Sequence, residues 1–245
     1  MKASARIDAL VRASRRLAAG CDRITFHEPV SFVYNPLRYA RRFHEEYIRR
    51  FAGSEKRAVF LGMNPGPWGM AQTGVPFGEV AAVRDWMGIS GTVHAPTAAH
   101  PRVKIAGFDC HRSEVSGHRL WGLIRDRYVS PNDFFREHLV VNYCPLLFLD
   151  PAGRNLTPDK INPQDRRALL LECDDHLRAV IEALAPRWLV GIGKFAQSRL
   201  EALQESMEGE AITVVGIPHP SPASPLANRD WAGSVTAVLR DAGIW

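Results

Sequence analysis

Three polar side chains stand out because each lies in or beside a loop that glycines and prolines constrain. They are Asn64 in GMNPGPWGMAQTGVPFGE (62–79), Asn142 in VVNYCPL (140–146) and His219 in GIPHPSPASPLANRDW (216–231). A carboxamide carries one acceptor and two donors side by side, so it can position a water molecule or pair with a polar ring. An imidazole can hold or transfer a proton near neutral pH.

The loop over 62–79 places five glycines and three prolines in 18 residues around Asn64. Such a backbone is preset, and its glycines let main-chain N–H groups approach something small and flat. An ordinary strand-to-helix turn is the plain alternative, but such turns usually need only about two to six residues. We therefore expect this loop to be functional.

The other two polar residues also have structural explanations. A lone histidine such as His219 is usually structural or merely exposed, and a buried asparagine such as Asn142 can simply hold backbone groups. Position favours function for His219, because it lies just past a predicted strand and has a proline on each side that limits its freedom. Asn142 ends another strand, and its carboxamide matches the N3–H donor and O4 acceptor of a uracil ring.

Short apolar segments and longer amphipathic segments alternate along the chain. The predicted strands are 57–62, 138–143, 187–192 and 211–217, and the predicted helices are 36–51, 117–127, 163–184, 194–208 and 225–241. Apolar strands that alternate with helices indicate a parallel sheet buried on both faces. We predict an α/β fold with three αβα layers and a central four-stranded parallel sheet, whose ligand lies at the carboxyl ends of the strands.

The whole chain, residues 1–245, is expected to form a single domain, because it contains no repeat and no low-complexity linker. Residues 1–25 are predicted to form a basic N-terminal helix, since Ile7, Leu10, Val11 and Leu17 recur at helical spacing. This segment lacks the apolar centre of a secretory signal, and no run of the chain is long enough for a membrane span.

The charge balance suits a polyanionic partner. The net charge is +5 and the pI is about 9.2. Arginines cluster towards the N-terminus, and either a solvated helix face or contacts to phosphates would explain them: Arg12, Arg15, Arg16, Arg38, Arg41, Arg42, Arg49 and Arg50. The four cysteines include no close pair, which argues against a disulfide framework or an iron–sulfur cluster and favours a reducing, intracellular compartment.

No metal and no organic cofactor are expected. A zinc site could be assembled on paper from residues whose spacing matches none of the usual ligand patterns, namely His94, His100, Cys110 and His111. Asp109 and Glu114 could act as a general base, but nothing in the sequence places either beside Asn64. We interpret both carboxylates as surface or loop-bracing groups.

The motifs around Asn64, Asn142 and His219 resemble those of the single-strand-selective monofunctional uracil-DNA glycosylase family, within the uracil-DNA glycosylase superfamily. The resemblance covers the chain from about Phe26 onward and includes the whole 62–79 run, SEVSG (113–117) and GRNLTP (153–158). It implies a four-stranded parallel sheet between helices, a base-flipping mechanism, and uracil and 5-hydroxymethyluracil as substrates. It also implies that DNA, both single- and double-stranded, is the partner.

The resemblance implies a role for each matching position. Asn64 would hold the attacking water, and His219 would donate a hydrogen bond to uracil O2 as negative charge develops there. The substrate-binding positions are Met63, Gly66, Met70, Phe77 and Asn142: Phe77 would stack on the base, Asn142 would select uracil over cytosine, and Gly66 and Met70 would border C5.

The loop from Pro220 to Leu226 would wedge into the gap that the base leaves, through Pro220, Ser221, Pro222, Ala223 and Ser224. Here the chain departs from the vertebrate pattern, which has arginine where this sequence has Ala223. A small side chain fills a vacated base stack poorly. Trp68 likewise replaces a more usual phenylalanine, which we attribute to packing.

These patterns favour a DNA-repair hydrolase of the base excision pathway that acts as a monomer in the nucleoid or cytoplasm of a bacterium or the nucleus of a eukaryote. No lysine lies beside the first motif to form a Schiff base, so the glycosylase is expected to be monofunctional. One alternative is a mismatch-specific uracil/thymine glycosylase of the same fold, which would match at Asn64 but not through QTGVPFGE. Another is a catalytically silent DNA-binding module.

Overall fold

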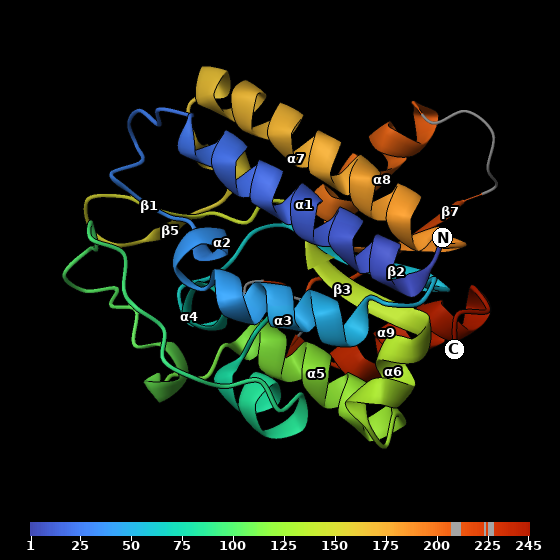
Figure 1. Cartoon of the computed structure of the whole chain (residues 1–245). Helices are drawn as coiled ribbons and strands as arrows, with labels where there is room; N and C mark the ends of the chain where they lie inside the picture. The colour runs from blue at the N-terminus through green and yellow to red at the C-terminus, as the bar shows by residue number, and fades with distance from the viewer. Residues whose placement is uncertain (207–211, 223, 225–227) are drawn as a thin grey trace.

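The computed structural model describes residues 1–206, 212–222, 224 and 228–245 (Figure 1). Its centre is a parallel sheet of β2 (Ala58–Gly62), β3 (His138–Asn142), β6 (Trp188–Ile192) and β7 (Thr213–Ile217), in the order β3-β2-β6-β7. Each strand lies within one or two residues of its predicted bounds. The central four-stranded sheet of the predicted α/β fold is confirmed.

The connections between the strands place helices on both faces of the sheet. Right-handed crossovers in opposite directions along a sheet put their helices on opposite faces. In Figure 1, α5 (Val115–Arg127) accordingly lies below the sheet, whereas α7 (Pro163–Leu184) and α8 (Lys194–Glu205) lie above it. The last helix, α9 (Trp231–Asp241), follows the final strand and also lies below the sheet. The N-terminal helix α1 (Ala3–Asp22) packs along α7. The three predicted layers are present.

Local signals set some helix bounds and tertiary packing sets others. The predicted start of α7 is confirmed, since the Asn162 side chain accepts a hydrogen bond from the Gln164 N–H at 2.9 Å and Pro163 follows it. The predicted helix over 36–51 is instead broken at Ala40 into α2 (Pro36–Tyr39) and α3 (Arg41–Phe51). The break lies where the loop at Gly74 packs closely on the Ala40 carbonyl.

Several short elements are absent from the sequence-based prediction. Strands β1 (Phe32–Tyr34), β4 (Leu147–Leu149) and β5 (Asn155–Leu156) form a small antiparallel sheet in the order β1-β4-β5. The other short elements are α4 (Met70–Thr73), α6 (Pro131–Glu137), a π-helical turn over Ala82–Trp86 and 3-10 turns at Gly107–Asp109 and Pro158–Lys160.

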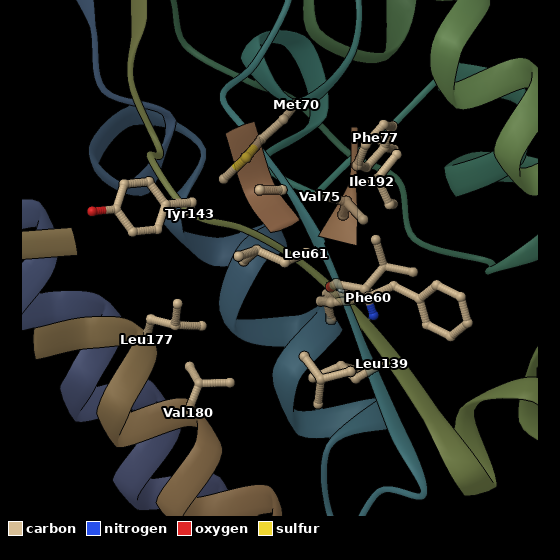
Figure 2. Packing of buried hydrophobic residues seen from close by; sticks show 14 of the residues in the cluster. Phe60, Leu61, Met70, Val75, Phe77, Leu139, Tyr143, Leu177, Val180 and Ile192 are labelled. Carbon is tan, nitrogen blue, oxygen red and sulfur yellow. Dashed lines mark hydrogen bonds between the residues drawn. The ribbon is translucent and has the colours of Figure 1, made fainter. Parts of the chain in front are cut away.

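The core continues from the sheet directly into the loop that follows β2. Figure 2 shows Met70, Val75 and Phe77 of this loop packed beside Leu61 and Ile192 of the sheet. All five side chains are buried, so the loop has a fixed position on the strands. Within the described residues, no helix combines the length and apolar character that crossing a membrane requires.

Candidate active site

A cavity of about 570 Å³ opens at the carboxyl ends of β2, β3 and β7. It is lined by Asn64, Asn142 and His219, so the three polar residues that the sequence singled out face one space. Other predicted site residues line the same cavity: Met63, Gly66, Met70, Phe77, Ser221, Pro222 and Ser224. Pro220 does not line it, and Ala223 lies outside the described residues.

The orientation of the Asn64 amide is fixed by backbone carbonyls. Its Nδ2 donates to the carbonyl of Leu146 at 3.2 Å and to those of Leu156 and Pro65 at 3.4 Å. Because carbonyls accept but cannot donate, the NH₂ end of the amide must face them. The Oδ1 atom is then the end available to accept a hydrogen bond from a water molecule in the cavity.

His219 has a defined tautomer. The N–H of Ser221 donates to His219 Nδ1 at 3.1 Å, so in the neutral ring the proton is on Nε2. Burial lowers the pKa of His219 below its ordinary value of 6.5, which favours this neutral form. At Gly193, where φ is +86°, a Cβ would lie 3.1 Å from the Cβ of His219. His219 therefore has an Nε2–H that can donate a hydrogen bond. Its side chain packs closely on Gly193, where a larger residue would be both strained and crowded.

Phe77 is held in an unusual backbone conformation beside His219. Its φ is +51°, a left-handed conformation that costs a non-glycine residue about 1–3 kcal/mol unless its surroundings impose it. The Nε1–H of Trp121 donates to the Phe77 carbonyl at 2.9 Å, and a Cβ on Gly62 would lie 2.4 Å from the Phe77 ring. The ring centroids of Phe77 and His219 are 6.3 Å apart. The ring thus lies against the end of β2, at the edge of the cavity.

Asn142 ends β3 directly opposite Gly62 of β2 and is 9% exposed. Its Nδ2 donates to the sulfur of Met70 at 3.3 Å. A thioether is a weak acceptor, so a carbonyl oxygen entering the cavity would be a better partner for this N–H. The amide can therefore pair with a polar ring edge.

The model of the Uracil DNA glycosylase superfamily matches residues 50–239. The single-strand selective monofunctional uracil-DNA glycosylase of Rattus norvegicus is 45% identical over 229 residues, which are 94% of this chain and 82% of that protein. The protein of the same name from Bos taurus is 45% identical over 222 residues, 91% of this chain and 81% of its own length.

The chain belongs to the single-strand selective monofunctional uracil-DNA glycosylase family. Among solved structures, the wild-type SMUG2 protein of Pedobacter heparinus superposes with a TM-score of 0.65 over 94% of this chain and 98% of that one. At 14% identity this similarity supports the fold alone.

In this member of the glycosylase family, the SEVSG motif braces the cavity. Glu114 caps α5 by accepting from the N–H groups of Ser116 and Gly117, and burial raises its pKa above the ordinary value. A Cβ on Gly117 would lie 2.1 Å from the carbonyl oxygen of Phe77, so the first turn of α5 packs closely on Phe77. Glu114 is a loop-bracing group, as expected, whereas Asp109 is exposed and away from the cavity lining.

Sequence reasoning missed several residues that line the glycosylase cavity: Pro65, Pro67, Trp68, Gly69, Ser113, Glu114, Val115, Ser116, Asn155 and Thr157. The motifs SEVSG and GRNLTP contain six of them, so the family resemblance included these positions but gave them no role. Trp68, interpreted as packing, lies on the cavity wall.

The N-terminal arginines mostly pair with carboxylates. Arg15 binds Glu45 through two nitrogens at 2.7 and 2.8 Å, and Arg49 binds the same carboxylate at 3.1 Å. Arg38 binds Asp22 at 2.5 Å. These arginines do not line the cavity. Arg41 also pairs with Glu45 and Arg50 with Glu46, so an ion-paired helix surface accounts for five of the eight arginines in the cluster.

The residues considered for a zinc site have other partners or surroundings. His100 is buried, with Nδ1 accepting from the Arg102 N–H at 3.1 Å and Nε2 lying 3.2 Å from the Pro151 carbonyl. In the part of the chain that the structure describes, no group of three or more His, Cys, Asp or Glu side chains is arranged to hold a metal ion.

Proposed function

We propose that this chain flips uracil out of DNA into the cavity and hydrolyses its N-glycosidic bond as a monofunctional base-excision glycosylase. The observation that carries the proposal is the complementary polarity of one cavity: an amide oxygen at Asn64 that can hold water, and an Nε2–H at His219 that can donate to a departing base.

The chemistry follows from these two groups. The C1′–N1 bond breaks with its electron pair leaving on the base, which gives a uracil anion and an oxocarbenium-like sugar. His219 donates to uracil O2, where the charge accumulates, and such a donor is worth about 3 kcal/mol of barrier. Asn64 cannot take a proton as a strong base, so it positions the water that adds to C1′. The water's proton leaves to solvent or to the base.

The remaining cavity residues define the base that fits. Phe77 stacks on the flipped ring, and a base–aromatic stack contributes roughly 1–3 kcal/mol. Asn142 donates to O4 and accepts from N3–H of uracil, whereas cytosine presents the opposite pattern on this edge. Met63, Gly66 and Met70 surround the C5 side, and we propose that they admit a hydroxymethyl group there, so that 5-hydroxymethyluracil is a second substrate.

The loop after β7 is proposed to fill the space that the flipped base leaves. Pro220, Ser221, Pro222 and Ser224 are its described members, and Arg119 of α5 donates to the Pro220 carbonyl at 2.9 Å. Flipping costs least for single-stranded or mismatched bases. We propose that the enzyme acts as a monomer on both single- and double-stranded DNA, in the compartment that holds the genome and without a cofactor.

The test is release of base from oligonucleotides with one uracil, scored as alkali-labile sites in single strands and in duplexes. We expect cleavage of uracil DNA and little release of thymine from G·T duplexes. Preferential release of thymine from G·T duplexes would favour the mismatch-specific alternative. DNA binding without any base release by the unaltered protein would favour the silent DNA-binding module.

A further inference from the structure

Arg112 lies over the ring of Trp68, which is part of the cavity wall. The guanidinium carbon of Arg112 lies 4.5 Å from the centroid of the Trp68 ring. Trp68 lines the cavity and is partly exposed, while Arg112 is exposed. Arginine also lies over aromatic rings elsewhere, as at Arg187 and Trp188, but Trp188 does not line this cavity.

The surroundings of this pair leave it open to a ligand. In the described residues no carboxylate lies within ion-pair distance of Arg112, whereas Arg15, Arg38 and Arg49 of the N-terminal cluster are all paired. Val115, the first residue of α5, lines the same cavity and is 42% exposed. Trp68 and Val115 thus line one cavity, and the Arg112 guanidinium, which has no ion-pair partner among the described residues, lies over the Trp68 ring.

We propose that Trp68, Arg112 and Val115 form a platform that stacks on a base adjacent to the flipped uracil in single-stranded DNA. The inference rests on the proposed function. Nucleic-acid proteins stack unpaired bases on aromatic rings and on guanidinium planes. In a duplex the adjacent base is already stacked and paired, so the platform acts mainly on single strands.

The experiment compares two single-stranded oligonucleotides that differ only beside the uracil. One has natural bases on both sides of the uracil, and the other has abasic spacers there. Stacking of one base corresponds to roughly a 5- to 150-fold effect. We expect Trp68→Ala and Arg112→Ala to lower kcat/KM by an amount in this range on the first oligonucleotide, mainly through KM, and by less than about twofold on the second.

Matched variants separate stacking from charge and from folding. Trp68→Phe keeps an aromatic ring and should retain most of the activity. Arg187→Ala removes the same charge and the same kind of stack at Trp188, so it should leave both substrates unaffected. Arg112 is exposed, so Arg112→Ala should fold. If Trp68→Ala does not fold, the difference in kcat/KM of Arg112→Ala between the two oligonucleotides still tests the platform.

Equal losses on the two oligonucleotides, or no loss on either, would overturn the platform. A loss for Arg112→Ala on both substrates that salt abolishes would indicate a phosphate contact instead, and would also overturn it. Failure of the unaltered protein to release uracil from either oligonucleotide would overturn the proposed function itself, which distinguishes the two failures.

Discussion

At the scale of single residues, the tautomer of His219 decides which ring nitrogen can donate a hydrogen bond into the cavity. The Ser221 N–H occupies Nδ1, and burial lowers the pKa of the ring, so the donor that we propose for the base is a neutral imidazole. His219→Ala should lower kcat by about 10²–10³-fold, the usual cost of one oxyanion donor, with little change in DNA affinity. Single-turnover cleavage and binding to a noncleavable analogue measure the two effects. A loss of binding equal to the loss of rate would contradict this role.

The lowered pKa of His219 also predicts how the cleavage rate depends on pH. Because the folded protein lowers the pKa of His219 below 6.5, the ring stays neutral as the pH falls through that value. The cleavage rate should therefore hold through pH 6.5 and fall only at lower pH. As the pH falls, the unfolded chain binds a proton at this histidine before the folded protein does. The contribution of His219 to the free energy of unfolding is therefore complete above pH 6.5 and is lost as the pH falls from 6.5 to the lower pKa of the folded state. A rate that rises as His219 gains its proton would favour a cationic donor.

Asn64 is expected to act by orientation. Asn64→Asp keeps the shape of the side chain but places an oxygen against the carbonyls of Leu146 and Leu156, where Nδ2 now donates. The held water is then displaced, and a misplacement of this kind costs about 10²-fold in rate. We expect kcat to fall by at least that factor with KM unchanged, as steady-state kinetics can show. An active Asn64→Asp enzyme would mean that a carboxylate can replace the amide as a base.

At the scale of elements, the first turn of α5 packs against the Phe77 backbone and so helps to fix the position of Phe77. Gly117→Ala would put a methyl group 2.1 Å from the Phe77 carbonyl, so it should destabilise the fold by about 1–3 kcal/mol and reduce base release. Gly122→Ala is the matched control on the same helix, because nothing lies within 4 Å of its Cβ. It should be neutral or stabilising by up to about 1 kcal/mol. Thermal melts and cleavage rates compare the two, and equal behaviour would exclude a clamp on Phe77.

Sequence patterns could predict the elements whose signals are local. The four buried strands and α7, with its Asn162 cap and Pro163, depend on runs of adjacent residues. The break at Ala40 and the sheet β1-β4-β5 depend on contacts between distant segments, as where the Gly74 loop meets α2. For the same reason, motif resemblance pointed to Asn64, Asn142 and His219, while the backbone groups that Glu114 braces, at the start of α5, became visible only from the structure.

At the scale of the whole molecule, α1 is an integral layer of the domain and not a separate basic arm. Arg6 is only 4% exposed and donates to the Ala183 carbonyl at 2.9 Å and to the Gly53 carbonyl at 2.8 Å. It also pairs with Glu55 at 2.9 Å. The first helix is thereby tied both to the end of α7 and to the segment that leads into β2, which is the strand that precedes Asn64.

Removing the Arg6 guanidinium tests that architecture. Arg6→Ala leaves two carbonyls without their donor, so we expect a loss of about 2 kcal/mol or more in the free energy of unfolding, measured with urea. Arg12→Ala, an exposed position on the same helix, should change stability by less than about 0.5 kcal/mol. Below the melting temperature of the Arg6→Ala protein, uracil release should match that of the unaltered enzyme, because the anchor lies away from the cavity lining. Unchanged stability would instead mean that α1 is held by its apolar face alone, through residues such as Leu10 and Leu17.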